Sequence, residues 1–395
     1  MKIHLINVIA PALLVACVSA PTATPTAVPT ATLAPSAALT PTLLAVVKST
    51  PTLTATASPR PSASPSPRPS ATSTPTPCTA TLRECAERKQ IQIGTYLNGQ
   101  QFPDARWKEI AAQEFNLAVV SSGFYWDEIE AARGQFNFAF VDEQVTFAQS
   151  KQMTICGHAL LLAAPPYIPD WLANGNFSRD ELAQILRTYI TQIMSRYKGR
   201  IGMYIVVEDP YHPPYQTVDV FYSKFGYDYV DLAFQIAREA DPSALLIFNN
   251  GENETSHGET TSLTRQIVQR LASKGLIDGV GLEMHLDATK PYAKQDVIAT
   301  MQSYGVPVYV TEIDVNLKDL PGTREERYAK QAQIYRDMFT ACLESGVCKS
   351  FAVWGFGDKY SWLERASPDA DPTIFDDRLD PKPAYFAIRD ALSGK

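Results

Sequence analysis

The chain has 395 residues, of which 45% are hydrophobic and 19% are charged, so it can bury the core of one large or two average domains. Its net charge is −7, and its Lys and Arg residues are scattered rather than gathered in runs, which leaves no basic surface for nucleic acid. This net charge favours a neutral or weakly charged substrate over nucleic acid.

The first 17 residues predict an export signal. Lys2 precedes an apolar stretch, 5–16, that is too short to span a bilayer as a stable helix. The sequence Leu14-Val15-Ala16-Cys17 resembles the bacterial lipobox, which implies that Cys17 becomes the lipidated first residue of the mature protein. The alternative is a secretory signal with a chance cysteine. Both interpretations predict an exported protein, and the first predicts a bacterial cell-surface lipoprotein anchored to the membrane through Cys17.

A linker follows over residues 18–77, which are almost wholly Pro, Thr, Ser and Ala. Such a composition cannot bury enough apolar surface to offset the entropy of ordering, so we expect a disordered tether. The folded domain is predicted over 78–395.

Beyond residue 88, short β-branched or apolar runs alternate with amphipathic helical stretches. A helix over 227–240 places Val230, Ala233, Phe234 and Ala237 on one face, and a second helix begins with the capping box of Thr323 and Glu326 and stops at Gly346. Eight runs are candidate strands: 91–96, 117–121, 153–158, 203–207, 245–249, 280–285, 306–311 and 350–354.

Eight such units in one domain favour an α/β fold of the closed (β/α)8 TIM-barrel type over an open sheet. No G-x-G-x-x-G follows the first strand, as a dinucleotide site would require. In these barrels the chemistry lies at the C-terminal ends of the strands. Polar residues at those ends are therefore the candidates for function.

The cysteines predict disulfides rather than a metal site. Cys342 and Cys348 lie close together on either side of Gly346, and in an oxidising compartment we expect them to form a bridge. Cys78 and Cys85 have similar spacing and could close the entry to the domain, whereas Cys156 is expected to be a buried free thiol. No spacing resembles a zinc site, and neither a metal nor another cofactor is expected.

Carboxylates end two of the predicted strands. Strand four ends in Glu208-Asp209, and Thr311 of strand seven is followed by Glu312-Ile313-Asp314. Two carboxylates across a cleft are what glycosidic cleavage requires, one to protonate the leaving oxygen and one to attack or stabilise the sugar. The competing interpretation is that such acids cap the following helices. Further polar and aromatic residues follow other strands: His158, Asn249, Glu283, His285, Trp354 and Trp362.

From about residue 89 to 393 the chain resembles the family-10 glycoside hydrolases, the endo-1,4-β-xylanase family. The segment 310–314 is similar to the nucleophile strand of the family (T-E-L-D), and 279–285 is similar to its G-x-G-L-Q-x-H strand. The resemblance implies that Glu312 is the nucleophile, supported by His285 and Asp314. It also places Cys342 and Cys348 where the family commonly has a disulfide.

The chain departs from the family within the site itself. The W-D-V-V-N-E strand of the family aligns with 204–209, so Asp209 stands at the acid/base position and Glu208 replaces an asparagine that normally donates to the sugar 2-hydroxyl. Asp209 is one methylene shorter than Glu, and Glu208 is the rival acid/base. Trp126 is the one match in the E-N-x-M-K-W motif, and Glu283 replaces a glutamine. The expected substrate-binding set is His158, Trp126, Asn249, Glu283, Trp354 and Trp362.

Two functions follow as hypotheses. The first is a retaining β-glycoside hydrolase acting on a plant-type polysaccharide, xylan by resemblance or a changed glycan. The second is a cell-surface glycan-binding protein whose hydrolysis is weakened by the change at the acid/base position. In either case the expected partners are a polysaccharide or oligosaccharide and the membrane, with no nucleic acid, and the protein is expected to be a monomer.

Overall fold

The computed structural model describes residues 78, 80–210 and 218–394. The predicted signal, the lipidated Cys17 and the linker lie outside these residues. Within the described ranges, no helix combines the length and the apolar character needed to cross a membrane.

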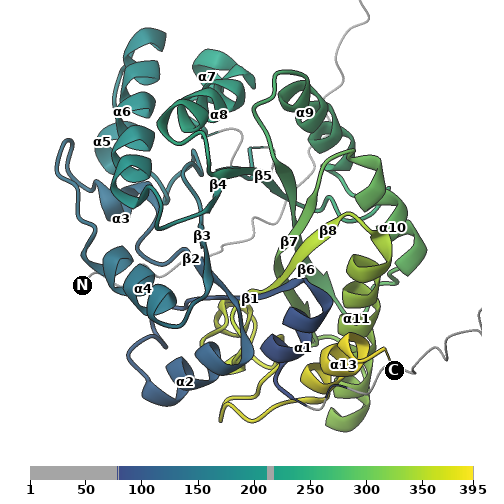
Figure 1. Cartoon of the computed structure of the whole chain (residues 1–395). Coiled ribbons are helices and arrows are strands. Elements are labelled where there is room, and N and C mark those ends of the chain that lie inside the picture. The colour runs from purple at the N-terminus through teal and green to yellow at the C-terminus, as the bar shows by residue number, and fades with distance from the viewer. Residues whose placement is uncertain (1–77, 79, 211–217, 395) are drawn as a thin grey trace, which may run out of the picture. The chain divides into compact units, whose positions relative to one another are not determined.

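Eight parallel strands close into a barrel in chain order, with β8 paired to β1 (Figure 1). This confirms the predicted (β/α)8 architecture. The strands are β1 (Gln92–Tyr96), β2 (Leu117–Val120), β3 (Thr154–Gly157), β4 (Met203–Glu208), β5 (Leu245–Gly251), β6 (Gly279–Asp287), β7 (Val308–Asn316) and β8 (Cys348–Val353).

The strands β6 and β7 continue past their predicted ends at residues 285 and 311. β6 and β7 stay paired through Glu283↔Glu312, His285↔Asp314 and Asp287↔Asn316, after a register shift between Leu282 and Glu283. Glu312 and Asp314 therefore lie inside β7, where the sequence had placed them just beyond its end.

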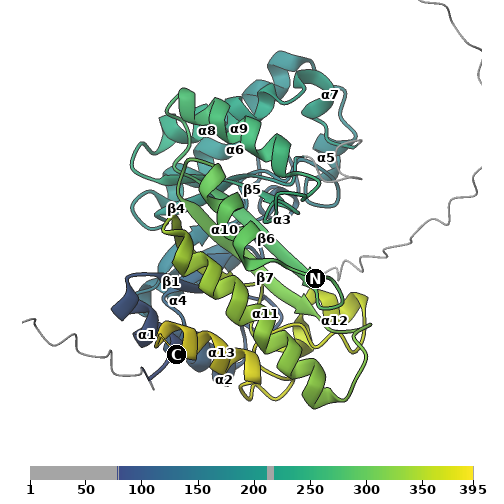
Figure 2. The same ribbon diagram turned by 90° about the vertical axis from the view of Figure 1, so that its right-hand side faces the viewer.

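Helices surround the barrel, and Figure 2 shows α10 and α11 side by side on one flank. The predicted helix over 227–240 is α8, and its four expected apolar residues are all buried. The capping box of Thr323 and Glu326 opens α11, which ends at Gly346 in the left-handed conformation (φ 72°), as glycine readily allows. The helices are α1 (Leu82–Lys89), α2 (Ala105–Glu114), α3 (Trp126–Ile129), α4 (Ala139–Ser150), α5 (Asp170–Ala173), α6 (Arg179–Tyr197), α7 (Tyr222–Phe225), α8 (Asp228–Ala240), α9 (Thr261–Ser273), α10 (Lys294–Ser303), α11 (Arg324–Ser345), η2 (Asp358–Tyr360), α12 (Trp362–Ala366) and α13 (Pro383–Leu392).

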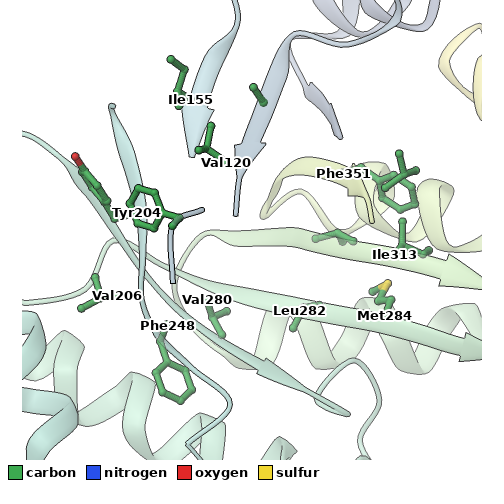
Figure 3. Packing of buried hydrophobic residues seen from close by; sticks show 14 of the residues in the cluster. Val120, Ile155, Tyr204, Val206, Phe248, Val280, Leu282, Met284, Ile313 and Phe351 are labelled. Atoms are coloured by element: carbon green, nitrogen blue, oxygen red, sulfur yellow. The ribbon is translucent and has the colours of Figure 1, made fainter. Parts of the chain in front are cut away.

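The core has two layers, because successive strand residues point to opposite faces of the sheet. In β2, Val120 belongs to the large cluster between strands and helices, part of which Figure 3 shows, whereas Leu117 and Val119 belong to a smaller cluster. Six strands contribute to the smaller cluster, so it fills the barrel interior. A substrate therefore cannot pass through the barrel and must bind at one end of it.

Both cysteine pairs form disulfides, Cys78–Cys85 and Cys342–Cys348. The second bridge confirms the prediction and joins the last turns of α11 to the start of β8. Cys156 is a buried free thiol, as expected.

Candidate active site

The strand register brings most of the predicted site residues to one end of the barrel. Glu208, the last residue of β4, pairs with Asn249 of β5, and Glu283 of β6 pairs with Glu312 of β7. His158 directly follows β3, and Trp354 directly follows β8. These positions all lie toward the C-terminal ends of the strands, where barrels of this type carry their chemistry.

Glu312 lies at the centre of this arrangement and is only 2% exposed. Its Oε1 lies 3.0 Å from His158 Nε2, and its Oε2 lies 3.2 Å from His285 Nε2. Asn249 Nδ2 donates a further hydrogen bond to Oε1 at 3.3 Å. Burial by itself would raise the pKa of Glu312, but the two imidazoles outweigh burial and lower that pKa to about 2. The carboxylate is thus ionised and held at both oxygens, as a nucleophile requires.

Asp314, itself bonded to Trp362, in turn holds His285 in place. Its Nδ1 lies 2.9 Å from Asp314 Oδ1, and the other oxygen of Asp314 accepts a hydrogen bond from the indole of Trp362 at 2.8 Å. Burial would lower the pKa of His285, but Asp314 and Glu312 together raise it well above its usual value. His285 is therefore a charged donor to Glu312, and the predicted support of Glu312 by His285 and Asp314 has a direct geometric basis.

Trp362 is expected to act through this contact. The Trp362→Phe variant keeps an aromatic ring but removes the hydrogen bond to the Asp314 carboxylate. Hydrogen bonds to charged groups contribute about 1.5–3 kcal/mol, so we expect kcat/KM to fall by about tenfold or more. Steady-state rates on an oligosaccharide would measure the loss, and an unchanged rate would show that His285 needs no support from Trp362.

Asp209 and Glu208, the two candidates for the acid/base, differ in their surroundings. Asp209 has a left-handed backbone (φ 45°), is partly exposed, and accepts a hydrogen bond from the Gly251 N–H at 2.9 Å. Glu208 is buried, with 6% of its surface exposed. Burial, with the negative charges of Glu312 and Asp209, raises the pKa of Glu208 to about 8 in spite of the nearby His158. Glu208 therefore carries a proton at neutral pH.

Asn249 links the strands behind the nucleophile. Its Nδ2 donates to Glu283 Oε1 at 2.7 Å, and its Oδ1 accepts from the Thr311 hydroxyl at 2.7 Å. Burial, reinforced by Asp209 and Glu312, raises the pKa of Glu283 well above its usual value. Asn249 thus orients Glu312, and Glu283 lies beside it as a second buried carboxyl group with a raised pKa.

The predicted aromatic residues are divided by the structure. Trp354 stacks on Tyr96 with ring centres 4.6 Å apart and contacts His158, and Trp362 is 40% exposed. Trp126 does not join them. It is 2% exposed, stacks on Tyr189 of α6 at 3.8 Å, and its indole N–H is taken up by Glu130. The expectation that Trp126 binds substrate is therefore wrong, because its ring packs inward between α3 and α6.

Two tyrosines belong to the site and were missed. Tyr96 ends β1, stacks on Trp354 and bonds to the Ser122 hydroxyl. Tyr125 lies close enough to Glu208 that burial and the Glu208 charge raise the pKa of its phenol well above the usual value. Tyr96 could have been found from the sequence, because it is a polar residue at the C-terminal end of a predicted strand.

Among the residues that the structure describes, two sets of three have nitrogen or carboxylate oxygen atoms within 4.8 Å of one another, namely His158 with Glu208 and Glu312, and Glu283 with His285 and Glu312. Such nitrogen and carboxylate groups can bind a cation. Both sets share Glu312, however, and each includes an imidazole that already contacts the Glu312 carboxylate. A metal here would compete with the contacts that keep Glu312 ionised.

Comparison with known proteins agrees with this geometry. The family model described as glycosyl hydrolase family 10 matches residues 81–391. Endo-1,4-beta-xylanase B of Thermotoga neapolitana is 32% identical over 326 residues, which cover 80% of this chain and 92% of that protein. The crystal structure of native xylanase 10B from Thermotoga maritima is 31% identical, with a TM-score of 0.74, and the match covers 80% of this chain and 98% of that one. Xylanase 10B from Thermotoga petrophila RKU-1, solved in complex with xylobiose, is 30% identical with a TM-score of 0.75 and the same coverage. The chain belongs to glycosyl hydrolase family 10.

Proposed function

We propose that the protein is a retaining β-glycoside hydrolase that cleaves a 1,4-β-linked polysaccharide within the chain, with xylan as the first substrate to test. The observation that carries the proposal is the ionised Glu312 held between His158 and His285. The xylanases that resemble this chain, and the xylobiose bound by one of them, support the substrate class.

In this mechanism Glu312 attacks the anomeric carbon while an acid protonates the leaving oxygen. Water then cleaves the glycosyl–enzyme ester, and the acid acts as the base. Asp209 takes the acid/base role. It lies one residue beyond β4 and is more accessible than Glu208, and its backbone conformation with the Gly251 contact fixes its carboxyl group. Glu208 is the alternative acid, because it is protonated at neutral pH.

The substrate can differ from that of the xylanases. Carboxyl groups at 208 and 283 stand where the family resemblance implies an asparagine and a glutamine, so the hydrogen-bonding groups offered to a sugar are changed. The second candidate function is glycan binding with weakened hydrolysis. It is favoured by the short side chain of Asp209, one of whose oxygens already accepts the Gly251 N–H.

Leaving-group dependence separates the two candidate acids. Removing a general acid costs about 100- to 10,000-fold in rate, but only when the leaving oxygen must be protonated. We expect Asp209→Asn to lose kcat/KM on xylan by such a factor and to keep most of its kcat/KM on an aryl glycoside with an acidic phenol, although the missing base slows the second step for both substrates. Glu208→Gln should show no such difference between the two substrates.

Reducing ends and phenol release measure the two rates. The opposite pattern would make Glu208 the acid, and glycan binding without release by the unmodified protein would leave only the binding function.

We further propose that the protein is exported, lipidated at Cys17 and monomeric. The two disulfides of the described domain suit an oxidising compartment. Incorporation of labelled fatty acid by the full chain, and its loss in Cys17→Ser, would test the anchor.

A further inference from the structure

Five side chains form a row across the mouth of the barrel in which carboxyl groups alternate with imidazoles. The row runs Asp314, His285, Glu312, His158, Glu208. Each imidazole directs Nε2 at Glu312 and Nδ1 at a second carboxyl group. We call His285 with Asp314 one arm of this row and His158 with Glu208 the other. The two arms differ in the distance between the imidazole and the outer carboxyl group. His285 Nδ1 lies 2.9 Å from Asp314, whereas His158 Nδ1 lies 4.0 Å from Glu208 Oε2.

The open arm leaves two buried polar atoms without a partner. His158 is fully buried and Glu208 is 6% exposed, and neither His158 Nδ1 nor Glu208 Oε2 has a hydrogen bond. A distance of 4.0 Å is too long for a hydrogen bond, and a buried polar atom without a hydrogen bond is unfavourable. A side-chain movement of about 1 Å would satisfy both atoms at once.

We propose that Glu208 is a positioning residue that acts on Glu312 through His158, in the way that Asp314 acts through His285. The inference rests on the proposed function in so far as Glu312 is the nucleophile. It gives the glutamate at 208 a purpose that an amide would fulfil less well, because a glutamate that has lost its proton, above its pKa of about 8, stabilises a positive charge on the imidazole more than a neutral amide oxygen does.

The charges around the pair fix the direction of the effect. Burial would lower the pKa of His158, but Glu208 and Glu312 raise it, with a contribution from Asp209. An ionised Glu208 favours the imidazolium, which in turn keeps donating to Glu312. Because the pKa of Glu208 is about 8, this support increases as the pH rises through that value. The groups facing His158 are Glu208 from β4, Asp209 just beyond β4, Asn249 from β5, Glu312 from β7 and the Trp354 ring. Glu208 is also faced by His285, Glu283 and Tyr125.

The test is the titration of His158 in the full chain labelled with ¹⁵N-histidine, which has five histidines. A His158→Gln variant assigns the signal. In Glu208→Gln we expect the midpoint of His158 to fall by about one pH unit, the size of effect that loss of a close opposite charge produces. The alkaline limb of kcat/KM should move to lower pH with it.

Glu283→Gln is the matched control. Glu283 is as buried as Glu208, but its carboxyl group accepts a hydrogen bond from Asn249, whereas Glu208 is the carboxyl group that faces His158 Nδ1. The Glu283→Gln variant should leave the midpoint of the His158 titration within a few tenths of a pH unit of its value in the unmodified protein. The His285 signal reports whether each variant keeps its fold. If Glu208→Gln folds poorly, Glu208→Asp takes its place: it keeps the charge but lengthens the distance to His158, so the His158 midpoint should lie between those of the other two proteins.

An unchanged His158 midpoint in both Glu208 variants would overturn the inference. The titration needs no substrate, so it decides the role of Glu208 even if the protein hydrolyses no glycan. Conversely, hydrolysis that depends on Glu312 together with an unchanged midpoint would leave the proposed function standing and remove only this inference.

Discussion

Replacing Glu312 with glutamine is expected to reduce kcat by at least about 1,000-fold, because it removes the one carboxylate that both imidazoles hold ionised. The amide is nearly isosteric, so the barrel should remain folded. With its pKa at about 2, Glu312 is ionised at any pH where the protein would be assayed, and the loss should therefore appear across the whole pH range. Release of reducing ends from xylan and other 1,4-β-linked polysaccharides measures the rate.

Two comparisons make this result specific. Glu114→Gln removes a half-buried carboxylate at the end of α2, where it accepts from Leu82 and Tyr385, and it should leave kcat within about twofold. In Glu312→Ala, azide can enter the vacated space and attack the sugar directly, which would give a glycosyl azide of inverted configuration. A Glu312→Gln variant that kept its activity would show that another group is the nucleophile.

The alternation of strands and helices was enough to predict the barrel, because each strand is a short apolar run and each helix has one apolar face. The lengths of β6 and β7 were not predictable, because their last residues are polar and are held by pairing with each other. The direction of the Trp126 ring was equally hidden. A tryptophan after a strand can face the mouth or the helices, and only the position of Tyr189 on α6 decides between them.

The central carboxylate and its His285 arm could be predicted from two segments that resemble the family. The His158 arm could not, because it joins residues from three separate strands or strand ends at distances that no local pattern encodes. The sequence showed that Glu208 was unusual. The structure adds which atom it faces.

A buried ion pair outside the row of five side chains at the mouth of the barrel holds the segment that carries Trp362. Lys382 Nζ lies 2.9 Å from Asp358 Oδ2, and the two side chains are 2% and 1% exposed. Asp358 Oδ1 also accepts from the backbone N–H and hydroxyl of Thr373, while Lys382 donates to the Asp371 carbonyl. Asp358 begins η2, and α12 with Trp362 follows directly. These contacts therefore fix the base of the loop whose indole reaches Asp314.

Lys382→Met should destabilise the protein by about 3–5 kcal/mol, because it leaves Asp358 buried without its cation. Chemical denaturation of the variant gives the change in the free energy of unfolding. The surface pair Arg106–Asp380 is the control: its side chains are 58% and 61% exposed, and Asp380→Asn should change stability by less than about 1 kcal/mol.

The double variant Lys382→Met, Asp358→Leu separates the charge from the packing. If the cost of Lys382→Met comes from the unpaired carboxylate, removing that carboxylate should recover much of the stability, although the Thr373 contacts are lost. Activity should recover less than stability, because those contacts position η2 and α12, and through Trp362 they orient Asp314 and His285. A double variant as unstable as Lys382→Met would show that the segment depends on the shape of these side chains rather than on their charges.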